Sequence, residues 1–199
     1  DSLKIFSPDV EVYSIDEAFV KFKYSRRRNH YEYLKTIKNS IFQWTGIPVS
    51  IGLGPTKTLA KIANSLAKKS KVECIYDLSS TSNQIEVLEN IQVENIWGIS
   101  KRWGAKLRLI GIGNALQLRN ASPQKIRKYL GVVLERIVYE LRGVSCLDLD
   151  QIQTRKNIMV SRSFGNPINN LTNLEQAISL YTVRACEKMR SQNSRAQTV

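Results

Sequence analysis

The sequence has 199 residues, of which 42% are hydrophobic and 24% are charged, the usual balance for a globular protein. No stretch approaches the roughly twenty apolar residues of a membrane-spanning helix, so a membrane protein is not expected. Thirty lysines and arginines against 17 aspartates and glutamates give a formal net charge of +13, which favours a polyanionic partner such as nucleic acid.

The cysteines and the first residue bear on where the protein works. Cys74, Cys146 and Cys186 are odd in number, widely separated and form no CxxC pair, so neither disulfides nor a zinc site is expected. We therefore expect a reducing, cytoplasmic compartment. The chain begins at Asp1 without a secretion leader, and we interpret it as an excerpt of a longer protein. Charge alone leaves open a basic surface that binds no nucleic acid.

Residues 10–22 predict a β-hairpin with acidic residues at its turn. They read VEVYSIDEAFVKF, in which two short β-prone runs flank the tetrad SIDE at 14–17. A helix is expected over about 31–44, ending at Gly46, because glycine commonly terminates helices. The apolar run 47–54 then predicts a buried strand.

The segment TKTLAKIANSLAKK at 56–69 predicts an amphipathic helix. Its apolar residues share one face while Lys57, Lys61 and Lys68 share the opposite one, so we expect one side to pack and the other to be cationic. With a further short strand near 73–76, this order of elements predicts an antiparallel or mixed sheet with helices on one face. Ferredoxin-like α+β layers are built in this way.

From about residue 79 the pattern changes to short helices, and we place a domain boundary there. The most strongly patterned helix is expected over 123–141, opened by Ser122 and closed by Gly143. The polar segment 145–156 lacks periodicity and predicts a linker.

A third domain is expected to begin after this linker. A strand is predicted over 158–164, with Arg162 alternating with apolar residues, and a helix over 172–189 opened by a capping box at 172–175. One strand and one helix cannot close a core of their own.

Asp16 and Glu17 are the first candidates for chemistry, because adjacent carboxylates at a tight hairpin turn form a site suited to Mg²⁺. Two carboxylates in contact repel, so burial would raise the pKa of one of them unless a divalent ion neutralises both. Phosphoryl-transfer sites use this arrangement. A solvated, inert acidic turn is the alternative, since turns favour such residues.

Lys57 and Lys61 are one turn apart on a helix whose other face is apolar, so both are expected to point out of the core. Lys57 would then meet DNA or nucleotide phosphate. The alternative is a solvated helix face without a ligand.

Residues 96–110 read IWGISKRWGAKLRLI and predict two short helices joined at Gly98, Ile99 and Ser100, with Lys101 and Arg102 directly behind. The pattern is similar to a helix-hairpin-helix. Such a hairpin presents backbone N–H groups to a DNA phosphate without sequence preference. An ordinary turn between packed helices is the alternative.

The hexapeptide YSIDEA at 13–18, followed by IPVSIG at 47–52 and KTLAKIA at 57–63, resembles the Y-family translesion DNA polymerases. The runs GPTKTLAK at 54–61 and WGIS at 97–100 resemble the UmuC-like branch, the catalytic subunit of bacterial DNA polymerase V. The resemblance covers nearly all of the chain.

The resemblance implies roles for individual residues. Asp16 would bridge two Mg²⁺ ions, and Glu17 would help to hold the ion that activates the 3′ hydroxyl of the primer. Lys61 would touch the incoming deoxynucleoside triphosphate, and Arg162 would lie on a DNA-facing sheet. The family also has an aspartate on an earlier strand. The sequence has none ahead of Asp1, so we expect one carboxylate ligand to be missing and this chain to be inactive alone.

The resemblance also implies a domain layout of α+β class. Residues 1–78 would form part of a ferredoxin-like palm, 79–144 an all-α thumb with the helix-hairpin-helix, and 145–156 a linker. Residues 157–199 would begin an α+β little-finger domain.

The leading hypothesis is error-prone translesion synthesis by the parent protein, in the bacterial cytoplasm, during DNA repair and the SOS response. Its partners would be a DNA primer-template and deoxynucleoside triphosphates, with a processivity clamp and a UmuD-like subunit, although no clamp-docking peptide is visible. Two alternatives stay open: a non-catalytic module that binds damaged DNA with a polymerase-like fold, and a cyclase-type palm.

Overall fold

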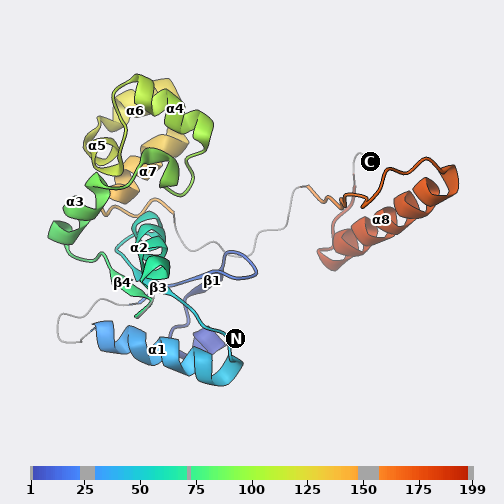
Figure 1. Cartoon of the computed structure of the whole chain (residues 1–199), viewed down its shortest axis with the longest axis horizontal. Helices are drawn as coiled ribbons and strands as arrows, with labels where there is room; N and C mark the ends of the chain where they lie inside the picture. The colour runs from blue at the N-terminus through green and yellow to red at the C-terminus, as the bar shows by residue number, and fades with distance from the viewer. Residues whose placement is uncertain (1, 23–29, 71–72, 148–156, 197–199) are drawn as a thin grey trace. The chain divides into compact units, whose positions relative to one another are not determined.

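The computed structural model describes residues 2–22, 30–70, 73–147 and 157–196 (Figure 1). The chain divides into two compact units, residues 1–150 and 151–199. Helices and short strands are both present, which confirms the predicted α+β class. The predicted linker at 145–156 lies mostly outside the described residues, and the predicted boundary at residue 79 stays a prediction.

The first unit begins with a 3₁₀ turn and the predicted hairpin. After η1 (Ser2–Ile5), strand β1 (Val10–Val12) pairs antiparallel with β2 (Ala18–Val20). The turn is closed by the carbonyl of Glu17, which accepts hydrogen bonds from the backbone N–H groups of Tyr13 and Ser14, each at 3.0 Å. This register leaves the acidic pair at the end of the hairpin.

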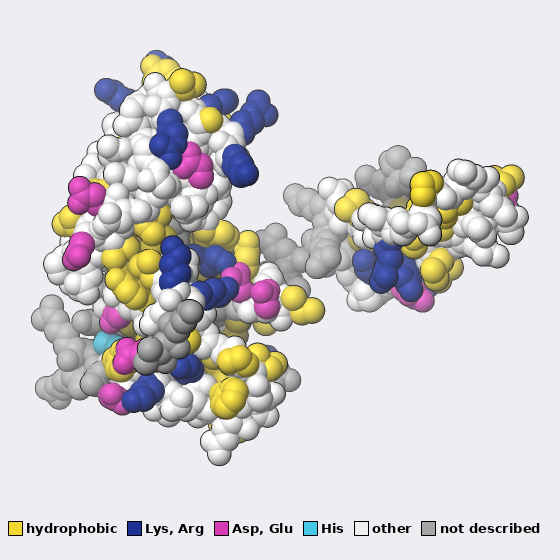
Figure 2. Space-filling model, viewed as in Figure 1, with side chains coloured by type: hydrophobic (Ala, Val, Ile, Leu, Met, Phe, Trp, Pro, Cys, Tyr) yellow, Lys and Arg dark blue, Asp and Glu magenta, His cyan; other side chains and the backbone are white. Residues whose placement is uncertain are grey.

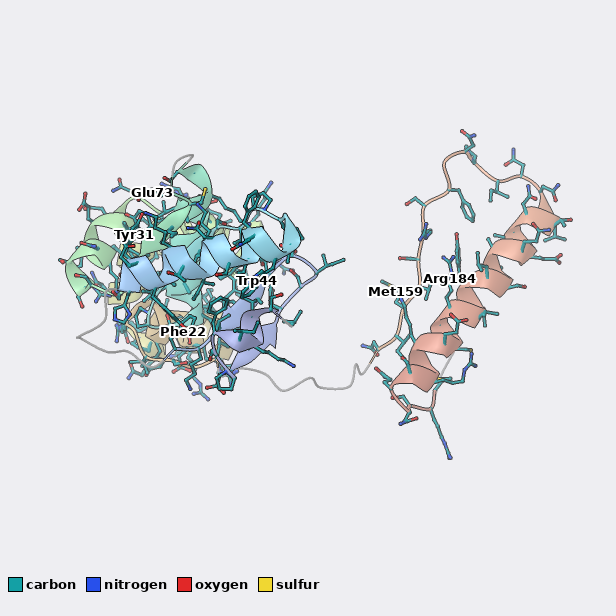
Figure 3. The ribbon with its side chains drawn as sticks, turned by 90° about the horizontal axis from the view of Figure 1, so that it is seen from below. Phe22, Tyr31, Trp44, Glu73, Met159 and Arg184 are labelled. Atoms are coloured by element: carbon teal, nitrogen blue, oxygen red, sulfur yellow. The ribbon has the colours of Figure 1, made fainter. Side chains whose placement is uncertain are left out.

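Helix α1 (His30–Thr45) forms as predicted and ends at Gly46, which adopts a φ of 69° that favours glycine. Its buried residues pack against β4 (Ile75–Asp77). The Tyr31 hydroxyl hydrogen-bonds to Glu73, and this bond, with smaller contributions from burial and nearby acidic charge, raises the pKa of Tyr31 to about 12. Figure 3 shows Tyr31 on α1 beside Glu73.

Helix α2 (Lys57–Lys69) connects β3 (Ile51–Leu53) to β4, which pairs with β3 in parallel. The described strands therefore form two separate two-stranded sheets, one antiparallel and one parallel, where the sequence predicted one larger sheet. Strand β3 is shorter than the predicted run 47–54 and is half-buried.

Strand β3 and helix α2 approach each other closely because Gly52 has no side chain. A Cβ atom added at Gly52 would lie 2.1 Å from the backbone nitrogen of Asn64 and 2.4 Å from the carbonyl oxygen of Ala60. Backbone atoms of a helix cannot move aside cheaply, so the position requires glycine.

The rest of the first unit is helical, as predicted. It contains α3 (Thr81–Glu89), η2 (Val93–Asn95), α4 (Lys101–Leu109), α5 (Ala115–Asn120), α6 (Pro123–Leu130) and α7 (Val132–Leu141). One buried cluster joins Leu59 and Ile62 of α2 to residues of these helices, including Leu107 and Leu134. Helix α2 therefore shares the core of the helical part, whereas Leu34, Ile37 and Ile75 form a second, separate cluster between α1 and the strands.

The single helix predicted over 123–141 is wrong, because the chain breaks it in two at Gly131. Gly131 has φ 91° and ψ 172°, far from helical values, and serves as the C-cap of α6 and the N-cap of α7. Apolar residues recur at helical spacing on both sides of the break, so periodicity alone conceals it. The predicted cap is confirmed, since the Ser122 side chain accepts from the backbone of Lys125 at 3.4 Å.

The second unit contains helix α8 (Leu171–Ser191). Its N-cap is Asn170, whose side chain accepts from the N–H of Thr172 at 2.8 Å, so the predicted capping box at 172–175 is wrong. The strand predicted over 158–164 is also absent from the described residues, and Arg162 lies exposed in irregular backbone. A strand needs a partner for its hydrogen bonds, and residues 157–196 contain no second strand.

No residue of α8 is buried, which agrees with the expectation that this segment does not close its own core. None of the helices in the described part of the chain combines the length and hydrophobicity that crossing a bilayer requires.

We expect Gly52→Ala to lower the free energy of unfolding by about 3 kcal/mol, the upper end of the usual cost of overpacking, because the new methyl group overlaps the backbone of α2. Urea-induced unfolding followed by circular dichroism measures the change. Gly113→Ala is the matched control, since its added Cβ meets only ordinary contacts at 3.6 Å. Equal stability of the two variants would contradict the close approach of β3 and α2.

Candidate active site

The hairpin turn and helix α2 meet through opposite charges. Glu17 Oε2 lies 2.6 Å from Lys61 Nζ, and Glu17 Oε1 lies 3.7 Å from Lys68 Nζ. Figure 2 shows acidic side chains lying against lysine and arginine side chains on this part of the first unit. The structure thus brings together the acidic turn and the cationic helix face that the sequence singled out.

Asp16 is exposed at the same turn and is favoured in its ionised form. The pKa of Asp16 lies below its usual value, first because the Ser14 hydroxyl donates to Asp16 Oδ1 at 2.6 Å and then because of a backbone hydrogen bond. Desolvation opposes this lowering of the pKa, and the positive charges of Lys68 and Lys61 add smaller contributions that lower it further. Asp16 is therefore a carboxylate at neutral pH, available to a cation.

Lys57 does not point out of the core, so that expectation is wrong. Its side chain is only 9% exposed, with Nζ 2.5 Å from Glu11 Oε2 on β1 and 5.2 Å from the centre of the Phe19 ring. A buried ammonium requires a counter-ion. Glu11 was missed in the sequence, although a carboxylate in the middle of a short strand is a signal that a cation faces it.

Lys61 lies in an aromatic setting that the sequence also did not reveal. Its Nζ is 5.4 Å from the ring centre of Tyr13 and 5.9 Å from that of Trp97. The indole N–H of Trp97 donates to the Tyr13 hydroxyl at 3.1 Å. Trp97 belongs to the helical part, so this contact joins that part to the hairpin. Cation–π contacts of this kind attract the ammonium group toward the ring faces.

The donor set at the turn bears on whether a metal ion fits. Within the residues that the structure describes, no group of three or more His, Cys, Asp or Glu side chains could hold a metal ion. Asp16 and Glu17 alone supply two carboxylates. Magnesium in phosphate-handling sites is bound by one or two carboxylates together with substrate phosphates and water, so the pair fits that pattern.

The turn at 98–100 is tightly built. Gly98 has φ 88°, and an added Cβ would lie 3.3 Å from Ile137 Cδ1. Ile99 is buried, and its N–H donates to the carbonyl of Ile96 at 3.0 Å. The first of the two predicted helices is wrong, because residues 96–100 form a bend and a turn, and the 3₁₀ helix η2 ends ahead of them at Asn95.

The second predicted helix is α4. Ser100 is its N-cap and accepts from the N–H of Trp103 at 3.4 Å. Lys101 and Arg102 occupy the first turn and are exposed. The first-turn N–H groups of a helix have no intrahelical acceptor, and the helix dipole adds positive potential there. The beginning of α4 is therefore a region of positive potential with two exposed cationic side chains.

Comparison with protein families gives matches at both ends of the chain. A model described as the impB/mucB/samB family matches residues 2–65, and one described as its C-terminal domain matches residues 155–199.

Two curated relatives indicate the breadth of the similarity. Protein UmuC of Salmonella typhimurium is 40% identical over 196 residues, which cover 96% of this chain and 46% of that protein. DNA polymerase IV of Picrophilus torridus is 35% identical over 141 residues, which cover 71% of this chain and 39% of that protein. The chain thus spans about half the length of the curated relatives it matches.

Solved structures share the fold at lower identity. A Y-family DNA polymerase chimera of Dbh and Dpo4 superposes with a TM-score of 0.71 at 20% identity, covering 94% of this chain and 55% of that one. DinB from Sulfolobus solfataricus gives a TM-score of 0.54 at 24% identity, covering 70% and 42%.

We expect Ser14→Ala to raise the pKa of Asp16 toward its usual value, because the largest cause of the lowered pKa is lost. Since the folded-state pKa is lowered, the stabilisation from Asp16 is present above the unfolded pKa and is lost as pH falls through the folded pKa. In Ser14→Ala the stabilisation from Asp16 is smaller, and its loss is complete at a higher pH than in the wild type. Carbon-detected NMR titration of the Asp16 carboxyl measures the shift, with Ser82→Ala as the control. An unchanged pKa would exclude Ser14 as the cause.

Proposed function

The chain belongs to the impB/mucB/samB family, and we propose on that premise that it carries part of the catalytic site and the DNA grip of a translesion DNA polymerase. The observation that supports this most directly is the 2.6 Å contact between Glu17 and Lys61. A carboxylate beside a lysine that could meet a triphosphate supports the proposal, because template-directed nucleotidyl transfer uses both kinds of group.

Asp16 and Glu17 would hold Mg²⁺. When bound, this ion would lower the pKa of the primer hydroxyl and neutralise phosphate charge. The protein's own contribution is to orient Asp16 through the Ser14 hydroxyl and to hold Glu17 by its backbone carbonyl at the hairpin turn.

Lys61 is the residue we assign to the incoming triphosphate. Its pair with Glu17 is partly exposed, at 21% and 23% of the two side chains, so solvent weakens it and a phosphate can compete for the amine. The rings of Tyr13 and Trp97 restrict the volume that the amine samples. Lys68, 57% exposed on the same helix, is a second cation within reach of the turn.

We assign Lys57 a structural role, in place of the phosphate contact that the sequence predicted. A direct contact with DNA or nucleotide phosphate would require its buried ion pair with Glu11 to break, which leaves a buried carboxylate without its cation. We therefore propose that Lys57 anchors α2 to β1 and so fixes the register of the helix against the hairpin.

The turn formed by Gly98, Ile99 and Ser100, together with Lys101 and Arg102, is proposed to bind the backbone of duplex DNA. Binding through backbone N–H groups and lysine or arginine charges positions the duplex without reading its sequence. The same applies to the suggested contact of Arg162, which rests on its exposure and on the family resemblance alone. A processivity clamp and a UmuD-like subunit stay predictions of the resemblance.

The parent activity we propose is error-prone synthesis across damaged templates, in DNA repair and the SOS response, with a DNA primer-template and deoxynucleoside triphosphates as substrates. We expect Asp16→Ala and Glu17→Ala each to lower primer extension by the full-length protein on the order of a hundredfold or more. Radiolabelled or fluorescent primers on denaturing gels measure this.

Glu89→Ala, an exposed carboxylate on α3, is the matched control for the loss of one negative charge. Full extension by both hairpin variants would reject the site assignment. Retained DNA binding without extension by the wild-type protein would favour the non-catalytic DNA-binding module.

The proposed DNA contact at residues 98–102 is tested separately. We expect this chain to bind duplexes of unrelated sequence with similar affinity, and Lys101→Ala and Arg102→Ala each to reduce the slope of log K against log[salt] by about 1. Fluorescence anisotropy across a salt series measures both quantities. Lys35→Ala, an exposed lysine of α1, is the control. Binding that does not depend on salt would contradict a phosphate contact.

A further inference from the structure

Glu140 on α7 is completely buried, with 0% of the residue exposed, and its carboxylate accepts hydrogen bonds from backbone N–H groups of two distant segments. Oε2 accepts from Thr58 at 3.1 Å, in the first turn of α2. Oε1 accepts from Cys146 at 2.6 Å and from Leu147 at 3.2 Å, in the segment that follows α7. One side chain thus connects α2, α7 and the chain beyond α7.

The main chain of the same residue makes a further connection. The carbonyl oxygen of Glu140 accepts from the Thr56 hydroxyl at 2.8 Å, and Thr56 is the N-cap whose Oγ1 also accepts from Leu59 at 3.3 Å. We call Glu140 with Thr56, Thr58, Cys146 and Leu147 the Glu140 latch. Figure 1 shows α2 and α7 as neighbours in the first unit.

The chemistry of the latch requires a carboxylate. A buried ionised group is costly unless several hydrogen-bond donors surround it. Here each carboxylate oxygen accepts from a backbone N–H group that has no helix carbonyl as its acceptor. The positive end of α2 favours the negative charge. Glutamine has the same shape, but its NH₂ group would face a backbone donor on one side.

We propose that Glu140 is a positioning residue, which fixes the first turn of α2, and with it Lys61, to α7 and to the start of the segment 145–156. Lys61 lies one turn beyond Thr58, so a tilt of the helix start moves its amine relative to Glu17. Glu140 acts through α2 and touches no reacting group. The consequence for nucleotide use rests on the proposed polymerase function, whereas the latch itself does not.

Amide hydrogen exchange in the 199-residue chain tests the latch directly. The N–H groups of Cys146 and Leu147 lie outside any helix or strand, so in the wild type they are protected only if a partner such as Glu140 holds them. We expect Glu140→Gln to reduce the protection of Thr58, Cys146 and Leu147 by about tenfold or more, since hydrogen bonds to charged groups are among the stronger ones.

Glu135→Gln is the matched control. It lies on the same helix and removes the same charge, but its carboxylate pairs with the Arg127 guanidinium at 3.2 Å. The three latch amides should keep their protection in that variant. Exchange of Cys146 and Leu147 at unprotected rates in the wild type would overturn the latch, and this measurement stands even where Glu140→Gln does not fold.

The positioning role is tested by steady-state primer extension with the full-length protein. We expect Glu140→Gln to raise KM for the incoming nucleotide by several-fold, about the effect of weakening one triphosphate contact, while the Kd for duplex DNA stays unchanged. A rise in KM that is accompanied by weaker DNA binding and lower thermal stability would indicate general unfolding and overturn the role. A wild-type protein without extension would refute the proposed function and the positioning role together, while the exchange pattern would still decide the latch.

Discussion

The packing of helix α2 between the strands and the helical part is the constraint on which the first unit depends. Its buried residues Leu59, Ile62 and Ala63 belong to the same core as the helices that follow. On the strand side, the backbone of Gly52 comes so near to α2 that a methyl group has no room. A helix held this closely on both sides cannot rotate, so the lysines along it keep fixed positions relative to the hairpin.

Two lysines on that helix illustrate how burial decides what a charge can do. Lys57 is enclosed with Glu11, and the removal of either side chain would break a largely buried ion pair. Lys61 is partly open to solvent, where an ion pair contributes about 0–1 kcal/mol and exchanges readily. The same residue type, one turn away, is therefore structural in one place and available to a ligand in the other.

The sequence predicted the hairpin, α1, α2 and α4, because each has a local signal: β-prone runs around a polar turn, apolar spacing at helical period, and glycine or serine at an end. It did not predict the break at Gly131, since the apolar spacing continues through it. Nor could it predict that Lys57 is buried, because the position of Glu11, 46 residues earlier, depends on how the hairpin packs. The strand expected over 158–164 failed for a related reason, since a strand forms only when a partner supplies its hydrogen bonds.

The contacts that the sequence could least reveal are those that connect the helical part to the candidate site. The Trp97 indole meets the Tyr13 hydroxyl across 84 positions of sequence, and the Glu140 carboxylate meets the Thr58 amide across 82. The first lies against the hairpin that carries Asp16 and Glu17, and the second against the start of the helix that carries Lys61. Both partners of the charged pair are thereby tied to the helical part, so the packing of that part limits how far Glu17 and Lys61 can move apart.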